Sequence, residues 1–268
     1  MIGVRLRERK RRIGEAAVAV ILLLGAWTVA DARRPYNRSV PGAFDYYLLS
    51  LSIAPSFCAT DRGRSDKTEC TEASDAAYRE TPLTVHGLWP NRIGVAGRNQ
   101  PGNCDGPPLG SLPDSLRADL ARYMPGSADG LDRYEWRKHG TCSGLDPAAY
   151  FSALITAAKE ADRVIGGAIQ SHGWFGRPVP IAELLDAVSE TNPALARSIV
   201  VNCRFRRKGA GESGGAAVIQ DIRVVLSRDF PGATLGPGAF VPLSEVGFQA
   251  NSGCPAGAGL LPAGFGAV

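Results

Sequence analysis

Residues 44–53 read FDYYLLSLSI, a nearly continuous run of aromatic and aliphatic side chains. A run of this length and composition predicts a buried β-strand, and the Ala54-Pro55 pair that follows marks its end. This strand is the fixed point from which we place the other expected elements of the fold.

The carboxyl-terminal part of the chain favours more strands. Residues 198–205 and 217–227 are rich in Val and Ile, and the glycine-rich residues 208–215 between them indicate a hairpin. In contrast, residues 90–108 are rich in Gly, Pro and Asn and predict a long loop.

Helical spacing dominates the middle of the chain. It predicts helices over residues 112–124 and 131–139, a third that begins at Asp146-Pro147, and a fourth over residues 180–190. Strands at both ends with helices between them, and no linker that separates large segments, predict a single α+β domain.

The amino terminus has the layout of an export signal. Six basic residues within the first twelve positions precede an uncharged apolar run over residues 16–30, which is short for a membrane span of about 20 residues. Small residues near Ala32 suit a signal peptidase, so we expect a signal peptide over residues 1–32 and a linker over residues 33–42. An uncleaved anchor is the second interpretation, and paired arginines leave a twin-arginine route open. Either way we expect a periplasmic or secreted protein.

All the cysteines lie beyond this leader: Cys58, Cys70, Cys104, Cys142, Cys203 and Cys254. Their even number predicts an oxidising compartment and three disulfides. Six cysteines allow 15 pairings, and their number does not choose among them. With three histidines and no clustered Cys/His spacing, we expect no metal site.

The charge of the chain argues against a protein that is basic throughout. The formal net charge of +4 belongs mostly to the leader, since the residues after position 32 include 24 basic and 23 acidic side chains. Any affinity for nucleic acid must therefore come from a local groove. A hydrophobic fraction of 44% with 21% charged residues excludes a disordered chain.

Two segments each carry a histidine in a suggestive setting. In LTVHGLWP, residues 83–90, His86 precedes Trp89 by three positions in an apolar stretch that Gly87 interrupts. Taken alone, such a pair is more often a packed, hydrogen-bonded part of a core than a catalytic site. The segment YEWRKHGTC, residues 134–142, favours the catalytic interpretation because it brings a second histidine.

In the helix expected over residues 131–139, Glu135, Lys138 and His139 project to one side. An imidazole titrates near neutral pH and serves as a general base or acid, and a fixed ammonium stabilises charge on phosphate oxygens. RNA cleavage needs a base for the 2'-hydroxyl and an acid for the departing 5'-oxygen, so two histidines suit that chemistry.

Several of these residues also have a structural interpretation. Asp132 and Glu135 have the spacing of a helix capping box, in which Glu135 would satisfy backbone groups at the helix start. Lys138 has a second interpretation as an ordinary, solvent-exposed lysine. Trp136 is expected in the core. His172 belongs to neither segment and is interpreted as structural.

Together, the two segments resemble the paired active-site motifs of the ribonuclease T2 family, the secreted acid endoribonucleases of fungi, plants and bacteria. The resemblance runs in order from FDYYLLSL at residues 44–51 and PSFC at residues 55–58, through both histidine segments, to Cys203 and Cys254. It covers nearly all of the chain beyond the leader.

The resemblance implies an endoribonuclease that transfers the phosphodiester of single-stranded RNA to the ribose 2'-oxygen. The product is a 2',3'-cyclic phosphate, which is then hydrolysed to a 3'-phosphate, and DNA is excluded because it lacks the 2'-hydroxyl. Position by position, the resemblance implies His86 and His139 as acid and base, with His139 the base. It also implies Glu135 and Lys138 as groups that stabilise the phosphorane, and Trp89 as a stacking partner of a base.

Three positions depart from the family pattern. Tyr134 stands where many members have a third histidine that holds phosphate, Asn91 replaces an acidic residue after the Trp-Pro pair, and Ile53 replaces a tryptophan. We keep Trp89, Asn91 and Tyr134 as candidate substrate-binding residues, and the base preference does not carry over.

The family fold is α+β, with a central antiparallel β-sheet packed against several helices, which agrees with the single domain expected from the residue patterns. The resemblance places a ribonuclease domain over residues 43–256, and residues 257–268 are expected to form a flexible tail of low complexity. The disulfides that it implies are Cys58 with Cys70, Cys104 with Cys142, and Cys203 with Cys254.

The expected partner is single-stranded RNA, with no cofactor, no metal and a monomeric enzyme that meets a membrane only through an uncleaved leader. A second hypothesis is a catalytically silent, secreted RNA-binding or recognition protein on the same scaffold, because a fold does not fix an activity. A metal-dependent phosphodiesterase is a poorer third, since clustered carboxylate and histidine ligands are absent from the sequence.

Overall fold

A computed structural model describes residues 39–60, 66–205, 217–232 and 235–266. The expected signal peptide, most of the expected linker and the glycine-rich residues 208–215 lie outside these ranges. Within them, no helix has both the length and the apolar character that crossing a membrane requires.

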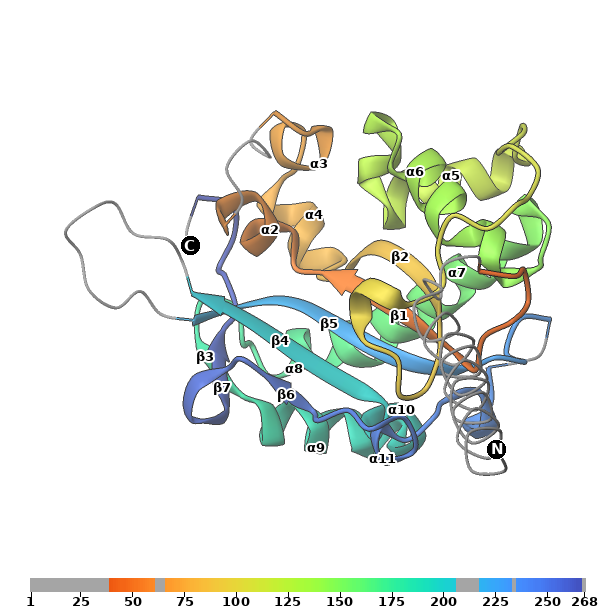
Figure 1. The fold of residues 1–268 in the computed structure, drawn as a ribbon. Coiled ribbons are helices and arrows are strands. Elements are labelled where there is room, and N and C mark those ends of the chain that lie inside the picture. The colour runs from red at the N-terminus through yellow and green to blue at the C-terminus, as the bar shows by residue number, and fades with distance from the viewer. Residues whose placement is uncertain (1–38, 61–65, 206–216, 233–234, 267–268) are drawn as a thin grey trace, which may run out of the picture. The chain divides into compact units, whose positions relative to one another are not determined.

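The centre of the fold is a seven-stranded sheet in which β1 (Tyr46–Ser52) lies between β2 (Thr84–Asn91) and β5 (Ala217–Ser227), as Figure 1 shows. Both neighbours run antiparallel to β1, and β4 (Ile199–Phe205) is antiparallel to β5. The other strands are short: β3 (Pro178–Pro180), β6 (Asn251–Ser252) and β7 (Ala258–Leu260). The predicted buried strand and the pairing of the predicted hairpin are confirmed, and the sheet is antiparallel apart from the short β4–β6 and β5–β7 pairings.

Strand β1 is buried along its whole length because both faces of the sheet are covered. Tyr47 and Leu49 belong to the main hydrophobic core, whereas Tyr46 and Leu48 pack in a smaller cluster on the opposite face. Alternate side chains of a strand point to opposite faces, so each face receives its own apolar set. The sheet is therefore the middle layer of an α+β domain.

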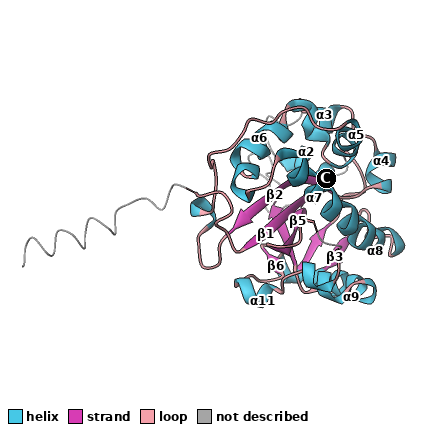
Figure 2. Ribbon diagram, turned by 90° about the vertical axis from the view of Figure 1, so that its right-hand side faces the viewer, coloured by secondary structure: helices cyan, strands magenta, loops and turns pink. Residues whose placement is uncertain are grey.

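The helices surround the strands, as Figure 2 shows. In chain order they are α2 (Ala54–Thr60), α3 (Thr68–Thr71), α4 (Asp75–Glu80), α5 (Asp114–Tyr123), α6 (Leu131–Lys138), α7 (Pro147–Ala161), α8 (Gly167–Ser171), α9 (Ile181–Thr191), α10 (Pro193–Ala196) and α11 (Leu243–Val246). The four predicted helices correspond to α5, α6, α7 and α9, with ends that differ by a few residues at most. Helices α2, α3 and α4 have too few turns for a periodic pattern to reveal them.

Helix α7 fixes the position of β2 against the core. Asp146 caps its start by accepting a hydrogen bond from the Ala149 backbone amide at 2.9 Å, and Pro147 occupies the first turn, where a missing N–H costs nothing. From its buried face, the Tyr150 hydroxyl donates to the Leu88 carbonyl oxygen at 2.7 Å. This bond joins the helix directly to the strand that carries His86.

The described residues 257–266 do not fit the expectation of a flexible tail over residues 257–268, of which the last two lie outside the described ranges. Strand β7 pairs with both β3 and β5, and the side chain of Leu261 is only 1% exposed. The Leu261 carbonyl accepts from the Gly176 amide, and the Tyr78 hydroxyl donates to the Pro262 carbonyl. The segment is rich in small residues, a composition that is typical of a flexible tail. Backbone pairing with distant strands nevertheless orders it.

We expect Leu261→Ala to lower the free energy of unfolding by about 2–5 kcal/mol, because it leaves a cavity in the core. Urea denaturation measures this loss. The matched control is Ile93→Ala at a 53% exposed position, where a change within about 0.5 kcal/mol is expected. Equal effects of the two substitutions would contradict an ordered carboxyl-terminal segment.

Candidate active site

His86 occupies an irregular position in β2. Ser50 of β1 pairs with Gly87, but the next residue, Leu51, pairs with Val85, so His86 is an extra residue that no β1 residue opposes. This arrangement is a β-bulge, which bends a strand and redirects a side chain, and bulges occur often beside active sites. The His86 side chain is 34% exposed, so it can meet a ligand.

Helix α6 brings the second histidine segment to the same place. The helix begins after Gly130, whose positive φ of 85° gives a turn that favours glycine, and no side chain caps its start. The capping-box interpretation of Asp132 and Glu135 is therefore wrong. The Glu135 carboxylate instead accepts a hydrogen bond from Nε1 of Trp89 at 2.7 Å, which links α6 to β2.

Glu135 is the buried centre of the site. Its side chain is 1% exposed, and its Oε1 lies 3.7 Å from Nε2 of His86. Burial raises the pKa of Glu135 to about 7, against the opposing effects of the Trp89 hydrogen bond and the Lys138 charge. This carboxyl therefore changes its charge near neutral pH.

His139 lies at the carboxyl end of α6, and its ring centre is 5.4 Å from that of Trp89. Burial lowers the pKa of His139 to about 3, and the positive charges of Lys138 and His86 lower it further. Its Nδ1 is buried and has no hydrogen-bond partner among the described residues. His139 is thus a neutral imidazole near neutral pH, which can accept a proton.

The disulfide between Cys104 and Cys142 holds the segment that follows His139. The Cys142 amide donates to the His139 carbonyl at 2.9 Å, and the Asn103 amide donates to the Lys138 carbonyl at 2.8 Å. The end of α6 is therefore tied to the long loop by the disulfide and by the hydrogen bond from Asn103. Such support limits the movement of the imidazole.

Lys138 and Tyr134 form a pair on α6. Nζ of Lys138 donates to the Tyr134 hydroxyl at 2.8 Å and lies 5.1 Å from the centre of its ring. Tyr134 is 41% exposed, so the pair lies at the surface of the site. We predicted that Glu135, Lys138 and His139 project to one side of the helix. This agrees with the effect of the Lys138 charge, which lowers the pKa of both Glu135 and His139. Trp136, on the other side, is in the core as expected.

The other two candidate substrate-binding residues differ in setting. Trp89 is partly buried between the site and the smaller hydrophobic cluster. Asn91 is only 7% exposed, and its side chain is hydrogen-bonded to Tyr46. The structure therefore places the Asn91 side chain inside the fold, which does not favour a direct contact with a nucleobase.

The family of the chain follows from the sequence profile of the Ribonuclease T2 family, which matches residues 44–205. The chain belongs to the ribonuclease T2 family. Ribonuclease I of Escherichia coli K12 is 28% identical over 235 residues, which are 77% of this chain and 84% of that protein. A ribonuclease of Aeromonas hydrophila is 35% identical over 124 residues, 46% of this chain and 48% of its own.

A solved structure, RNase NT in complex with 5'-AMP, has the same fold, with a TM-score of 0.54, 20% identity, and coverage of 82% of this chain and 98% of its own. The family places this chain among the endoribonucleases. The three disulfides that the family resemblance implies, Cys58–Cys70, Cys104–Cys142 and Cys203–Cys254, are confirmed. They indicate that this ribonuclease folds in an oxidising compartment.

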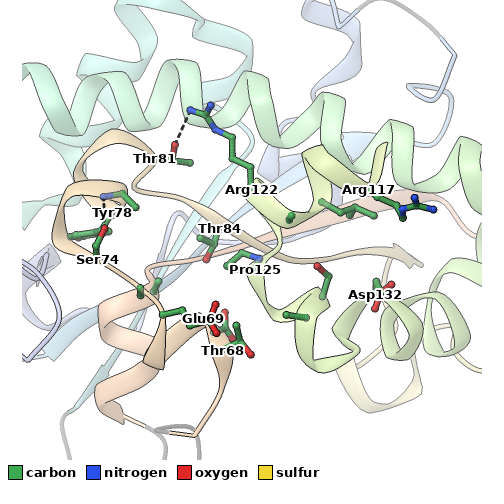
Figure 3. Close-up of a pocket in the computed structure, with 18 of the residues that line it drawn as sticks. Thr68, Glu69, Ser74, Tyr78, Thr81, Thr84, Arg117, Arg122, Pro125 and Asp132 are labelled. Atoms are coloured by element: carbon green, nitrogen blue, oxygen red, sulfur yellow. Dashed lines mark hydrogen bonds between the residues drawn. The ribbon is translucent and has the colours of Figure 1, made fainter. Parts of the chain in front are cut away.

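The ribonuclease also has a cavity of about 920 Å³, shown in Figure 3. Its lining includes parts of α3, α4 and α5 and three residues from elements of the site, namely Thr84 on β2 and Asp132 and Arg133 on α6. Thr84 lies two positions before His86 on β2, and Asp132 lies three positions before Glu135 on α6. The two histidines and Glu135 do not line it, so the cavity and the histidine site have different side chains.

Sequence reasoning missed two residues of the site, Gly87 and Arg223. A Cβ at Gly87 would overlap the Glu135 carboxylate and Nε1 of Trp89, so only glycine leaves room for their hydrogen bond. The guanidinium of Arg223, on β5, lies over the Trp89 ring at 5.6 Å. No local pattern marks either residue, although an isolated glycine inside an apolar segment does hint at a close approach.

We expect Gly87→Ala to lower kcat/KM for RNA about 100-fold, because the methyl group displaces Glu135 from Trp89 and small displacements in an active site are costly. Steady-state RNA cleavage, below the unfolding temperature of the variant, measures this. The control is Gly238→Ala, where a Cβ has no atom within 4 Å. Activity of Gly87→Ala within twofold of the control would refute this account of the glycine.

We also expect Glu135→Gln to change how stability depends on pH. The native protein favours protonated Glu135, so the contribution of this group is complete below its usual pKa of 4.5 and is lost as the pH rises towards 7. The free energy of unfolding of Glu135→Gln relative to the unmodified protein should therefore rise by about 2–3 kcal/mol between pH 4.5 and 7. Urea denaturation at both pH values measures it, and a difference that stays constant would contradict a raised pKa.

Proposed function

We propose that this ribonuclease cleaves single-stranded RNA by transphosphorylation with His139 as the base and His86 as the acid. His139 takes the proton of the ribose 2'-hydroxyl, and the 2'-oxygen attacks phosphorus. The bond from phosphorus to the 5'-oxygen breaks as His86 donates a proton to that oxygen, which leaves a 2',3'-cyclic phosphate. Water then opens the ring with the two roles reversed, and a 3'-phosphate remains.

One observation carries this proposal: both imidazoles contact the same indole. The ring centres of His86 and His139 lie 5.9 and 5.4 Å from that of Trp89. The histidines are far apart in the sequence, and a structural role for each would not require a common partner. Their meeting on one side chain is what an acid and a base acting on one phosphodiester need.

The division of roles rests on the surroundings of each ring. The low pKa of His139 keeps its imidazole in the neutral form that a base needs, at the cost of a lower basicity. Nε2 of His86 lies 3.7 Å from Oε1 of Glu135, a carboxyl group that changes its charge near neutral pH, so this pair can hold the proton that His86 donates. The positive charge of His86 is itself one cause of the low pKa of His139. One neutral and one charged ring are the starting state of the reaction.

The remaining residues act on charge and position in this proposal. Lys138 stabilises the negative charge that builds up on the phosphorane oxygens, and Tyr134, which holds Nζ of Lys138, takes the place of the family's third histidine. Glu135 orients Trp89 and balances the charge of His86. No step requires a metal ion or a cofactor.

The substrate is RNA rather than DNA, because the attacking group is the 2'-hydroxyl. The expected export leader and the three disulfides support action in the periplasm or outside the cell. The nucleotide in the RNase NT structure, 5'-AMP, supports a site that accepts RNA components.

The test compares the unmodified protein with His86→Ala and His139→Ala on single-stranded RNA in excess chelator. We expect cyclic phosphate ends from the unmodified protein and a loss of kcat/KM of about 10²- to 10⁴-fold in each variant. His172→Ala is the matched control, because the ring of His172 stacks on Trp174, outside the site, at 4.6 Å.

The outcomes separate the competing functions. Cleavage that the chelator abolishes would replace the proposal with a metal-dependent reaction. RNA binding without any cleavage would favour the catalytically silent protein. Full activity in either His86→Ala or His139→Ala would remove that histidine from its role.

A further inference from the structure

Arg223 lies on the face of the sheet that carries the active site. It pairs across β5 and β1 with Ser50, and Ser50 pairs with Gly87 on β2, so all three residues share one face. Figure 1 shows β5 next to β1 and β1 next to β2. From this position the guanidinium carbon reaches to 5.6 Å from the centre of the Trp89 ring. A third strand thus contributes a cation to the surroundings of the two histidines.

The guanidinium is held in place by polar neighbours. Nε of Arg223 donates to Oδ1 of Asp221 at 2.9 Å, and Nδ2 of Asn202 donates to the same oxygen at 2.7 Å. The Asp221 side chain is 16% exposed and that of Arg223 is 35% exposed. The carboxylate therefore fixes the inner edge of the guanidinium, while its outer part is accessible to solvent.

Most of the hydrogen-bonding capacity of Arg223 is unused within the described residues. A guanidinium has five N–H donors, and the only hydrogen bond that Arg223 makes there uses Nε. Both Nη groups keep their donors, in the planar arrangement that matches two oxygens of one phosphate. If Arg223 served only in an ion pair with Asp221, its two Nη groups would not need to be exposed to solvent beside the candidate catalytic site.

The proposed reaction supplies the ligand for these Nη groups. An RNA strand longer than a dinucleotide presents further phosphates on either side of the one that is cleaved. The residues after position 32 have almost no net charge, so the affinity for these phosphates must come from particular cationic side chains and not from overall charge. Arg204, whose charge also acts on Asp221, adds to the positive potential at this part of the sheet.

We propose that Arg223 binds a phosphate next to the one that is cleaved, while its guanidinium holds the Trp89 ring in place. This subsite rests on the proposed function, since it needs an RNA strand that passes over the two histidines. Asp221 and Asn202 are positioning residues, because they act on the RNA only through Arg223. Recognition at this subsite is of the backbone, so it depends on strand length and on salt, and not on base sequence.

The experiment measures kcat/KM for a single-stranded RNA octamer and for a dinucleoside monophosphate, which contains only the phosphate that is cleaved. Arg223→Met should lower the ratio of kcat/KM for the octamer to kcat/KM for the dinucleoside monophosphate about fivefold, as expected for a partly exposed, charge-assisted contact. The slope of log kcat/KM against log salt for the octamer should become shallower by about 0.7, the value of one phosphate contact on a single strand. Arg223→Lys should restore the salt dependence of the unmodified protein but only part of the kcat/KM ratio, because an ammonium group lacks the paired donors of a guanidinium.

Arg163→Met is the matched control, since it removes an exposed arginine that is paired with Glu160 away from the site. An unchanged ratio in Arg223→Met, or a ratio and slope equal to those of the control, would overturn the proposal. An equal loss on both substrates would also overturn it, because Arg223 would then act only by supporting Trp89. Failure of the proposed function itself is seen separately, as uncleaved octamer with the unmodified protein.

Discussion

The hydrogen bond from Trp89 to Glu135 is the contact on which the site depends. It joins β2 to α6 across 46 positions of sequence and occupies one oxygen of a carboxylate that is almost completely buried. A buried carboxylate without partners would be costly, so the two elements are stable only when they are joined in this way. Gly87 makes the bond possible, because any side chain there would fill its space. Both imidazoles are placed relative to this one junction.

The same junction sets the charges of the site. Burial raises the pKa of Glu135 and lowers that of His139, because in each case water is removed from the charged form. Lys138 and His86 add positive charge at the same point, which keeps His139 neutral. The protein thus keeps ionisable groups in an environment that opposes their charged forms, a common cost of an active site.

Rigid neighbours preserve this arrangement on three sides. The Tyr150 hydroxyl on α7 holds β2 through the Leu88 carbonyl, and the Cys104–Cys142 disulfide holds the end of α6. On the face of the sheet that carries Ser50, Arg223 lies over Trp89 and is fixed by Asp221. The candidate catalytic groups are therefore carried by a strand and a helix whose positions the core determines.

The sequence alone determined the elements whose cause is local. The apolar run at residues 44–53, the hairpin strands and the four longer helices are visible because side-chain periodicity and composition act over a few residues. The two histidine segments and the family resemblance predicted the candidate site, and the resemblance also gave the disulfide pairing. Long-range packing set the bulge at His86, the inward side chain of Asn91, the position of the Arg223 guanidinium and the order of the last strand. Each of these depends on the register between strands that are distant in sequence, and register is a property of long-range packing that no local pattern records.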